Sequence, residues 1–430
     1  MKRIFCVTDF GAVADGDALQ TAAIQAAIDA CFTYGGGEVT VPAGVYLVGS
    51  LRLRSHVTLH LLEDAVLKGS RDPEDYMCFY DDTLESIEDV IEPAFPVGIL
   101  TRWYNAIIRA HFAKDIKIIG ERGAVIHGQN CYDAKGEEGF RGPHAISMYG
   151  CEGVELAGYT VIDSANWAHC INRSRNIHVH NLTVLGGHDG VHFRICDNVL
   201  VEDCELITGD DSVAGFNNLN MAVLRCTLNS SCSAFRLGGT DVLIDRCRVV
   251  GPGRYGHRWT MTDEEKKAGA PTTEKHRHNT LTGFLYFCYG NFELRAAPGR
   301  IVVQNTDFEN VDCLFNLEFK QHIWCCNRSL GDITFRNCRA LGVVEPMRAY
   351  SDANEPLTMR MIDCEISLRE GAAPCALLVG HDMKEIELQN VTASGFGGDA
   401  ALRIRANDLP SAAPVITLRD CTGIAVARES

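Results

Sequence analysis

The sequence predicts an all-β fold, a right-handed parallel β-helix with a small α/β cap at its N-terminal end. Short segments with alternating apolar residues recur from about residue 116 onward, and many of them are followed by Asn or Asp. Alternation with a period of two is typical of strands that bury one face. The copies that carry Asn181, Asp203, Arg225 and Arg246 lie 22, 22 and 21 residues apart, which is too short for a crossover that contains a helix. Parallel strands joined by short turns and wound into a solenoid fit this spacing best.

The solenoid is expected to span residues 1–430 as a single domain, because each coil of a repeat architecture packs on its neighbours alone. Residues 1–50 are expected to form the capping segment. Asp17 or Thr21 is expected to cap a helix there, and the glycines at 35–37 are expected to end it. The apolar face of this helix carries Ile24, Ile28, Cys31 and Phe32. A strand is predicted to begin at residues 38–41, so the glycine-rich turn lacks the strand-to-helix order of a phosphate loop.

The repeats carry the pattern apolar-x-apolar-x-(Asn/Asp). Copies lie at residues 116–118, 154–156, 177–181, 199–204, 223–226, 242–247, 301–305, 333–338, 359–364, 386–390 and 416–421. The recurring Asn or Asp is expected at the turn after the strand, because these residues tolerate left-handed backbone and their side chains can bond along the stack. Cysteine at the following position is expected to form an interior ladder of small, reduced core residues.

The interval at residues 251–300 breaks the period. Its polar stretch, residues 257–279, is rich in Lys, His and Thr, and repeats resume after it, so we interpret it as an insertion rather than a linker. Two interpretations stay open for this insertion: a lid over a functional groove, or a solvated surface loop.

Composition and charge exclude some classes of function. The chain has 40 basic and 56 acidic residues and a net charge of −16, which argues against nucleic acid as a partner. No apolar core of signal-peptide length follows Lys2-Arg3, and no apolar run is long enough to cross a membrane. The 19 cysteines follow the repeat rather than a metal-ligand spacing. Reduced cysteines and the missing signal predict a cytoplasmic location, and the oligomeric state stays open.

Three aspartates form the candidate catalytic group. Asp189 and Asp211 are 22 residues apart, and Asp210 precedes Asp211. That interval is one coil, and adjacent coils lie ~4.8 Å apart, so the carboxylates of Asp189 and Asp211 are expected to be neighbours. Two carboxylates at that range cannot both ionise freely, which provides the acid and the base that glycoside hydrolysis requires. On spacing alone, ordinary turn aspartates of the ladder are an equal alternative.

The adjacent pair raises a question of geometry. Neighbouring residues of a strand point to opposite faces, so Asp210 and Asp211 can share one wall where the backbone is irregular. Gly209 is expected to permit that irregularity.

Several motifs in the first 250 residues carry a family resemblance. They are Asp9-Phe10-Gly11-Ala12, Asp15-Gly16, residues 21–31, 35–37, 41–46, 59–61 and 65–70, Asn166-Trp167, Asp189-Gly190-Val191 and residues 208–214. With them the chain resembles glycoside hydrolase family 28, the polygalacturonases and their relatives. The spaced Asp-Gly and Gly-Asp-Asp motifs are the specific portion, because the N-terminal motifs are shared widely among pectin-type β-helices. The resemblance implies an inverting hydrolase in which Asp210 is the general acid and Asp189 and Asp211 are general bases.

Two motifs depart from the family pattern. Ser231-Cys232-Ser233 stands where the family has Gly-His-Gly, and His257-Arg258-Trp259-Thr260 stands where Arg-Ile-Lys is expected. Those basic residues bind the galacturonate carboxylate in the family, so the sugar is expected to differ from galacturonate. A milder departure is Gly187-His188-Asp189 in place of Asn-Thr-Asp. The related dextranase group keeps the three aspartates without that His and Lys, so catalysis can survive while the substrate changes.

Several polar and aromatic residues are candidate substrate ligands. Arg236 is expected to contact a carboxylate, a sulfate or ring hydroxyls, or else to form a surface ion pair. Arg258 and His257 are candidates from the departing basic motif. Four more lie beside Asp189 or one coil before it, namely His188, His192, Trp167 and His169. Trp167 either stacks on a sugar or packs in the core. The histidines form no tight ligand motif, so neither a metal nor a cofactor is expected.

The sequence therefore predicts a glycosidase that cleaves O-glycosidic bonds of an oligosaccharide, which is pectin-related or another uronic-acid or galactose-type glycan. Exo action is expected if the insertion closes one end of the groove. The alternative is a β-eliminating lyase or an epimerase on the same scaffold. Either needs a base at C5 and a cation such as Ca²⁺ to neutralise the uronate, and the paired aspartates can bind Ca²⁺. A non-catalytic carbohydrate-binding β-helix ranks third, motivated by the two missing motifs.

Overall fold

The computed structural model describes residues 3–77, 102–288, 296–297, 299–319, 328, 330–396, 400–405 and 414–429. Contacts divide the chain into two compact units, each built from parallel β-strands. Unit 1 comprises residues 1–192, 207–209 and 255–276. Unit 2 comprises residues 193–206, 210–254 and 277–430. The chain passes from one unit to the other within β18 (Val191–Arg194) and β20 (Glu205–Thr208).

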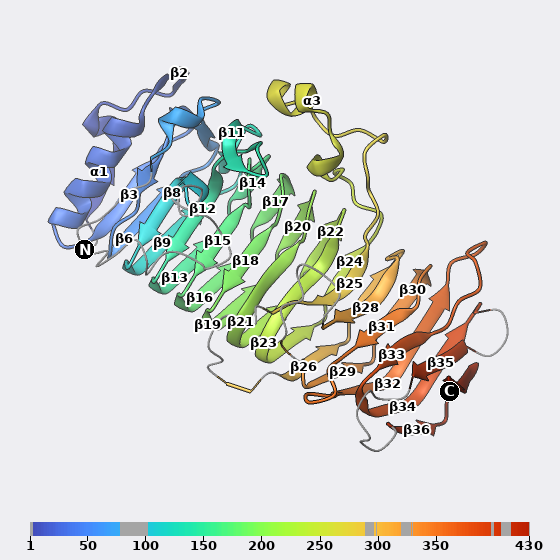
Figure 1. Cartoon of the computed structure of the whole chain (residues 1–430). Helices are drawn as coiled ribbons and strands as arrows, with labels where there is room; N and C mark the ends of the chain where they lie inside the picture. Colours follow the sequence, from blue (N-terminus) through green and yellow to red (C-terminus); the bar gives the residue numbers. More distant parts are fainter. Residues whose placement is uncertain are drawn as a thin grey trace. The chain divides into compact units, whose positions relative to one another are not determined.

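Unit 1 contains three rows of parallel strands. Its strands are β1 (Ile4–Cys6), β2 (Asp15–Leu19), β3 (Gly37–Val41), β4 (Gly44–Val48), β5 (Leu51–Arg52), β6 (Val57–Leu61), β7 (Ala65–Gly69), β8 (Ala106–His111), β9 (Lys114–Gly120), β10 (Val125–His127), β11 (Tyr132–Glu137), β12 (His144–Tyr149), β13 (Glu152–Ala157), β14 (Thr160–Ile162), β15 (His169–Asn172), β16 (Arg175–His180) and β17 (Thr183–Gly186). One row runs β1–β3–β6–β9–β13–β16. The second runs β2–β4–β7–β10–β14–β17, and the third runs β5–β8–β12–β15. Figure 1 shows β6, β9, β13 and β16 of the first row side by side.

The helices of unit 1 lie at its start and in its later segments. They are η1 (Val7–Phe10), α1 (Thr21–Thr33), η2 (Pro73–Asp75), η4 (Arg258–Thr260) and α3 (Asp263–Ala268). Helix α1 packs against β1, β3, β5 and β6, as expected of a cap. No helix in the described part of the chain is long and apolar enough to cross a membrane.

The predicted cap of α1 is wrong. The N-cap residue is Gln20, which makes no side-chain capping bond. Asp17 lies within β2, and the hydroxyl oxygen of Thr21 instead accepts the Gly49 N–H at 2.8 Å. The side chain of Thr21, which the sequence predicted as a helix cap, therefore makes a tertiary contact with Gly49 instead.

The apolar face of α1 is confirmed in part. Ile24, Ile28 and Cys31 are fully buried, whereas Phe32 is 37% exposed. The guanidinium of Arg54 lies 4.1 Å from the centre of the Phe32 ring, so this ring sits at the rim as a cation–π partner.

Unit 2 repeats the same arrangement. Its strands are β19 (Asp197–Glu202), β21 (Val213–Leu224), β22 (Thr227–Ser230), β23 (Ser233–Asp245), β24 (Arg248–Val250), β25 (Thr282–Tyr286), β26 (Gly299–Gln304), β27 (Asp307–Glu309), β28 (Cys313–Glu318), β29 (Asp332–Arg336), β30 (Arg339–Val343), β31 (Met347–Tyr350), β32 (Leu357–Leu368), β33 (Leu378–His381), β34 (Met383–Ser394), β35 (Ala400–Arg405), β36 (Val415–Arg419) and β37 (Ile424–Glu429). The main row runs β19–β21–β23–β26–β29–β32–β34–β36. Two further rows run β22–β24–β27–β30–β32 and β23–β25–β28–β31–β33–β35–β37. The parallel rows confirm the predicted solenoid.

The predicted turn ladder is confirmed. Left-handed backbone, with φ between 50° and 55°, occurs at Asn181, Asp203, Arg225, Arg246, Asn305, Asn337, Asp363, Asn390 and Asp420. Side chains bond along the stack, for example from Asn337 Nδ2 to Asn305 Oδ1 at 2.7 Å. Where arginine replaces the amide, as at Arg225, it pairs with Asp203 of the preceding coil at 2.8 Å. The cysteines that follow are buried, namely Cys204, Cys226, Cys247, Cys338 and Cys364, and the described cysteines form no disulfide.

The inserted segment is shorter than the predicted range 251–300, of which residues 289–295 and 298 lie outside the described residues. Strand β25 pairs with β23 and β28, so the ladder resumes at Thr282. Before it, residues 255–276 belong to unit 1 and contain η4 and α3. This part is anchored rather than a loose loop, because Arg71 Nη2 donates to the Ala268 carbonyl at 2.7 Å.

Candidate functional site

His192 holds Asp189 in unit 1. Two glycines, Gly186 and Gly187, have φ values of 75° and 69° and turn the chain at the end of β17 just before Asp189. The carboxylate is buried, and its Oδ2 lies 2.7 Å from Nδ1 of His192, which donates to it. A hydrogen bond donated to a carboxylate favours its ionised form. The contact therefore suits Asp189 to the role of a base.

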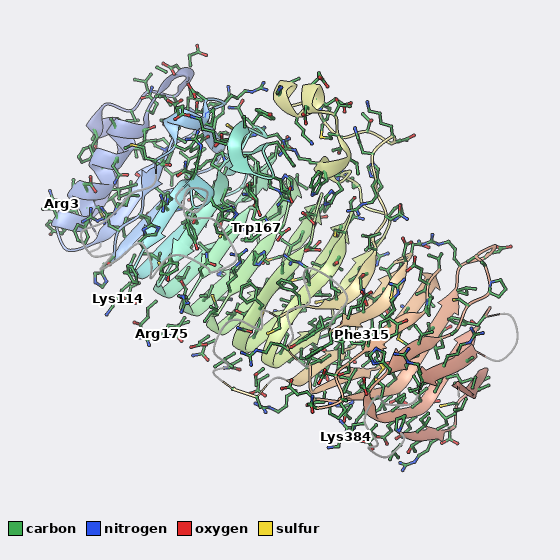
Figure 2. The ribbon with its side chains drawn as sticks, viewed as in Figure 1. Arg3, Lys114, Trp167, Arg175, Phe315 and Lys384 are labelled. Atoms are coloured by element: carbon green, nitrogen blue, oxygen red, sulfur yellow. The ribbon has the colours of Figure 1, made fainter. Side chains whose placement is uncertain are left out.

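Trp167 supports His192 from within the core. The two rings stack with centres 3.7 Å apart and planes 11° apart, and Trp103 packs edge-on against Trp167 at 5.1 Å. Trp167 is 4% exposed. Figure 2 shows it among the strands, away from the edge at which Lys114 and Arg175 project. Of the two interpretations of Trp167, the structure favours core packing that positions the imidazole of His192.

His169 has the packing of a core histidine. Its Nδ1 donates to the Gly190 carbonyl at 3.0 Å, and its Nε2 lies 2.9 Å from the hydroxyl of Tyr159. Burial lowers the pKa of His169 to about 4, so the ring is neutral at neutral pH. Its place in the core favours a structural role beside Asp189 over direct substrate contact.

Arg258, from η4, brings a buried guanidinium beside His188. Its Nη1 donates to the Ala165 carbonyl at 3.3 Å and lies 3.4 Å from Nε2 of His188. The Phe140 ring is 5.7 Å from the guanidinium carbon and 5.7 Å from the centre of the His188 ring. Burial, and then the positive charge of Arg141, lower the pKa of Arg258 to about 10.

Burial of Arg258 destabilises the folded state. Its Nε and Nη2 are buried and have no hydrogen-bond partner among the residues that the structure describes. A buried polar group left in this way costs about 1–3 kcal/mol. His257 starts the turn that places it, because the His257 Nδ1 accepts the backbone N–H of Trp259 at 3.3 Å. A costly buried charge is typical of functional positions.

Arg236 and a backbone amide hold Asp211 in unit 2. The Ser233 N–H donates to Asp211 Oδ1 at 3.0 Å, and Nε of Arg236 pairs with Asp211 Oδ2. The Phe287 ring lies 4.5 Å from the guanidinium. Burial raises the pKa of Asp211 above the usual aspartate value, Arg236 opposes this, and the charge of Asp210 adds to the rise. Of the roles open to Arg236, the structure shows an ion pair, in which the partly buried guanidinium engages the buried candidate catalytic residue Asp211.

Asp210 and Asp211 lie between β20 and β21, outside regular strand, as the sequence predicted. The Asp211 N–H donates to Asp210 Oδ1 at 3.1 Å, and the Ser230 hydroxyl donates to the Asp210 carbonyl at 2.7 Å. Gly209 acts differently from the expectation. It has no left-handed φ, and a Cβ there would lie 2.5 Å from the Gly187 carbonyl oxygen, so close backbone approach requires the glycine.

The segment Ser231-Cys232-Ser233 supports the aspartate pair. Burial, and then the charges of Asp211 and Asp210, raise the pKa of Cys232 well above its ordinary value. The thiol therefore stays protonated. With Ser233 bonding Asp211 through its amide, the segment that replaces Gly-His-Gly orients a carboxylate instead of supplying an imidazole.

The register places the departing basic motif outside the coils. The row continues from β23 to β25, with Leu285 opposite Arg236. Residues 257–260 lie before that strand, in η4 and its N-cap. Arg258 therefore occupies the inserted segment and not the strand position in which a basic coil residue was expected.

The site residues fall into two groups. Asp189, His188 and His192 lie in unit 1 with Trp167, His169, His257 and Arg258, whereas Asp210, Asp211 and Arg236 lie in unit 2. The convergence of Asp189 with the aspartate pair stays a prediction. Sequence reasoning missed Phe140, which no motif marks. It also missed the amide of Ser233, which the coil register signals because Ser233 follows Asp211 by 22 residues.

Fold and site together define the class: a parallel β-helix with buried, paired carboxylates of the kind that act on glycans. The family described as Glycosyl hydrolases family 28 matches residues 99–232. The family described as rhamnogalacturonase A/epimerase, pectate lyase-like, matches residues 4–61. These matches confirm the resemblance of the chain to glycoside hydrolase family 28.

Related proteins match part of the chain. A probable polygalacturonase from Vitis vinifera is 30% identical over 230 residues, which is 48% of this chain and 43% of that protein. An exo-poly-alpha-D-galacturonosidase from Dickeya chrysanthemi is 29% identical over 264 residues, 50% of this chain and 42% of that protein. A mannuronan C5-epimerase from Azotobacter vinelandii is 51% identical over 59 residues, 12% of this chain and 6% of that protein. The chain spans less than half the length of these relatives.

Solved structures confirm the fold class as a right-handed parallel β-helix. The family 28 exopolygalacturonase of Yersinia enterocolitica superposes with a TM-score of 0.59 at 17% identity, covering 100% of this chain and 79% of that one. The exopolygalacturonase of Thermotoga maritima gives a TM-score of 0.59 at 17% identity, covering 91% of each chain.

Proposed function

We propose that the chain is a polygalacturonase-like glycosidase that hydrolyses an O-glycosidic bond of an oligosaccharide, which is pectin-related or another uronic-acid or galactose-type glycan. One observation carries the proposal. The segment that matches family 28, residues 99–232, contains Asp189, Asp210 and Asp211, and all three aspartates are buried. Carboxylates in environments that separate their protonation states are what acid–base cleavage of a glycosidic bond requires.

The contacts of each carboxylate support its role. Asp189, with its bond from His192, and Asp211, with its bonds from Ser233 and Arg236, are the general bases that activate water. The charges of Asp210 and Asp211 oppose each other, which favours a proton on one of the pair. Asp210 is the general acid in this scheme, and the product is formed with inversion.

We infer that the substrate is an acidic sugar at a chain end. Arg258 supports a uronate, because it is a buried cation beside His188, the residue that precedes Asp189. The relative from Dickeya chrysanthemi is named as an exo-enzyme, which supports exo action, as does the anchored segment 255–276. The cytoplasmic location predicted from the sequence is part of the same proposal.

Hydrolysis of a panel of uronate and galactose-type oligosaccharides, galacturonate trimer among them, by the wild type and by Asp210→Asn tests the proposal. Loss of the general acid is expected to lower kcat about 10²–10⁴-fold. Asp241→Asn is the matched control, because Asp241 is exposed at a coil turn and pairs with Arg300. NMR of the first product is expected to show the inverted anomer.

Three results would contradict the proposal. Undiminished turnover by Asp210→Asn would show that Asp210 is not the general acid. An ultraviolet-absorbing product that disappears with a chelator would indicate a lyase. Binding without turnover across a broad glycan panel would indicate a carbohydrate-binding protein.

A further inference from the structure

Trp259 is an exposed tryptophan in η4 of unit 1. It is 55% exposed, whereas Trp103 and Trp167 are buried. Leaving an indole at the surface forgoes the stabilisation that its burial would give. An exposed indole presents a flat apolar face on which a ligand ring can stack.

The indole of Trp259 is held in place. Its Nε1–H donates to Oε1 of Glu138 at 3.1 Å, and the ring packs edge-on against Phe140 at 6.4 Å. The backbone N–H of Trp259 bonds to His257 Nδ1 at 3.3 Å. A side chain fixed in this way loses little conformational entropy when a ligand lands on it.

The segment behind Trp259 is built as a support. Helix α3 starts with a capping box, in which Thr262 and Glu265 bond to each other's backbone. Arg71 ties its last turn to unit 1 through the Ala268 carbonyl at 2.7 Å. All of these bonds lie within unit 1.

Phe140 connects Trp259 to the candidate site. Its ring contacts Trp259 on one side at 6.4 Å and His188 on another at 5.7 Å. His188 directly precedes Asp189. Phe140 therefore links the indole to the residue that precedes Asp189.

We propose that Trp259 is a stacking platform for one pyranose ring of the oligosaccharide, namely the sugar next to the cleaved bond. The inference rests on the proposed function, because it places Asp189 at the cleavage point. The apolar C–H face of the sugar would lie on the indole. The ammonium of buried Lys266 lies 5.7 Å from the centre of the indole ring and 4.3 Å from that of Phe140, so it helps to fix both rings.

Kinetics with Trp259→Ala and Trp259→Phe test the platform. Using galacturonate trimer, the alanine variant is expected to raise KM about tenfold and to change kcat less than about twofold, because the ring binds substrate without touching the reacting atoms. The phenylalanine variant is expected to restore most of the loss. Tyr34→Ala is the matched control, since Tyr34 is 59% exposed, stacks with Arg3 and lies in the cap. Equal KM for the wild type and Trp259→Ala would overturn the inference.

A binding experiment separates this inference from the proposed function. Galacturonate trimer and a neutral α-glucan trimer are titrated into the wild type and the two variants, with isothermal titration calorimetry as the readout. If the wild type binds a trimer without hydrolysing it, and Trp259→Ala binds it about tenfold more weakly, the stacking platform is supported. The same result contradicts the proposed hydrolase function. Equal binding by both proteins, or no binding of either trimer to the wild type, overturns the platform.

Discussion

Replacement of Arg258 with methionine is expected to stabilise the folded chain and to weaken substrate binding. Methionine keeps much of the apolar contact with Phe140 while removing the charge. The guanidinium is buried, and two of its nitrogens have no described hydrogen-bond partner. Replacement of a buried charge that lacks a carboxylate by an apolar group is often stabilising.

The magnitude follows from the pKa. Its lowering from the usual value to about 10 corresponds to about 3 kcal/mol of destabilisation, from burial first and then from the charge of Arg141. Loss of the bond to the Ala165 carbonyl gives back about 1 kcal/mol. The net gain in the free energy of unfolding is about 2 kcal/mol. With an unfolding entropy of ~2.1 cal/mol/K per residue over 430 residues, the thermal midpoint rises by about 2 °C.

Thermal unfolding of the two proteins by circular dichroism is the assay. Because folding lowers the pKa of Arg258, the charge destabilises the folded state at every pH below about 10, and the penalty is relieved as the pH rises above that value. The difference between Arg258→Met and the wild type is therefore expected to stay constant between about pH 6 and about pH 9. In parallel, KM for galacturonate trimer is expected to rise.

Arg141→Met is the control for this experiment. Arg141 is buried too, but its Nε lies 2.7 Å from Glu138 Oε2. Breaking that pair is expected to destabilise the chain by about 3–5 kcal/mol. If Arg258→Met lowers the midpoint as Arg141→Met does, the guanidinium of Arg258 is compensated and the reasoning from its burial is refuted.

Three further predictions concern the aspartates and their supports. Arg236→Gln removes the positive charge that opposes the raised pKa of Asp211, so that pKa is expected to rise further. The acidic limb of the pH profile of kcat/KM is therefore expected to move to higher pH. An unmoved limb would show that Asp211 is not the base. His192→Ala removes the hydrogen-bond donor to buried Asp189 and is expected to lower kcat about 10²-fold with little change in KM. His192→Asn is expected to recover part of this activity. An equal loss of kcat in both variants would contradict the positioning of Asp189 through Nδ1 of His192. Gly209→Ala places a Cβ against the Gly187 carbonyl and is expected to lower the free energy of unfolding by about 1–3 kcal/mol, measured by denaturant unfolding. An unchanged midpoint would show that the backbone accommodates the Cβ and that close approach does not require glycine.

The fold was predictable because its requirements repeat. A coil turn needs a left-handed residue once per coil, and Asn or Asp at the same position of successive copies, as at Asn337 and Asn390, meets that need each time. The helix cap was not predictable for the opposite reason. Thr21 has the right side chain for a cap, but Gly49, which is 28 residues later, uses its hydroxyl oxygen.

The sequence marked the aspartates and, among their contacts, His192 and Arg236, but not the backbone amide of Ser233. Spacing alone marked Asp189 and Asp211, because both obey the coil period. The same period would have paired Asp211 with Ser233, but the amide that makes the contact carries no side-chain signal. Phe140 and Trp259 meet across 119 residues through an inserted segment without a period, so no repeat could predict that contact.

The neighbouring residues Arg258 and Trp259 break two rules of stability, since one buries a charge and the other exposes an indole. Along the coil turns the rules are kept, as where Arg339 pairs with Asp307 at 2.6 Å. Where neighbouring residues break such rules and their surroundings keep them, stability does not explain why those side chains are present. Sugar recognition is therefore expected in η4 rather than in β25, where Leu285 follows Arg236 in the row. Substitutions in η4 should change which sugar binds, and substitutions in β25 should change the free energy of unfolding.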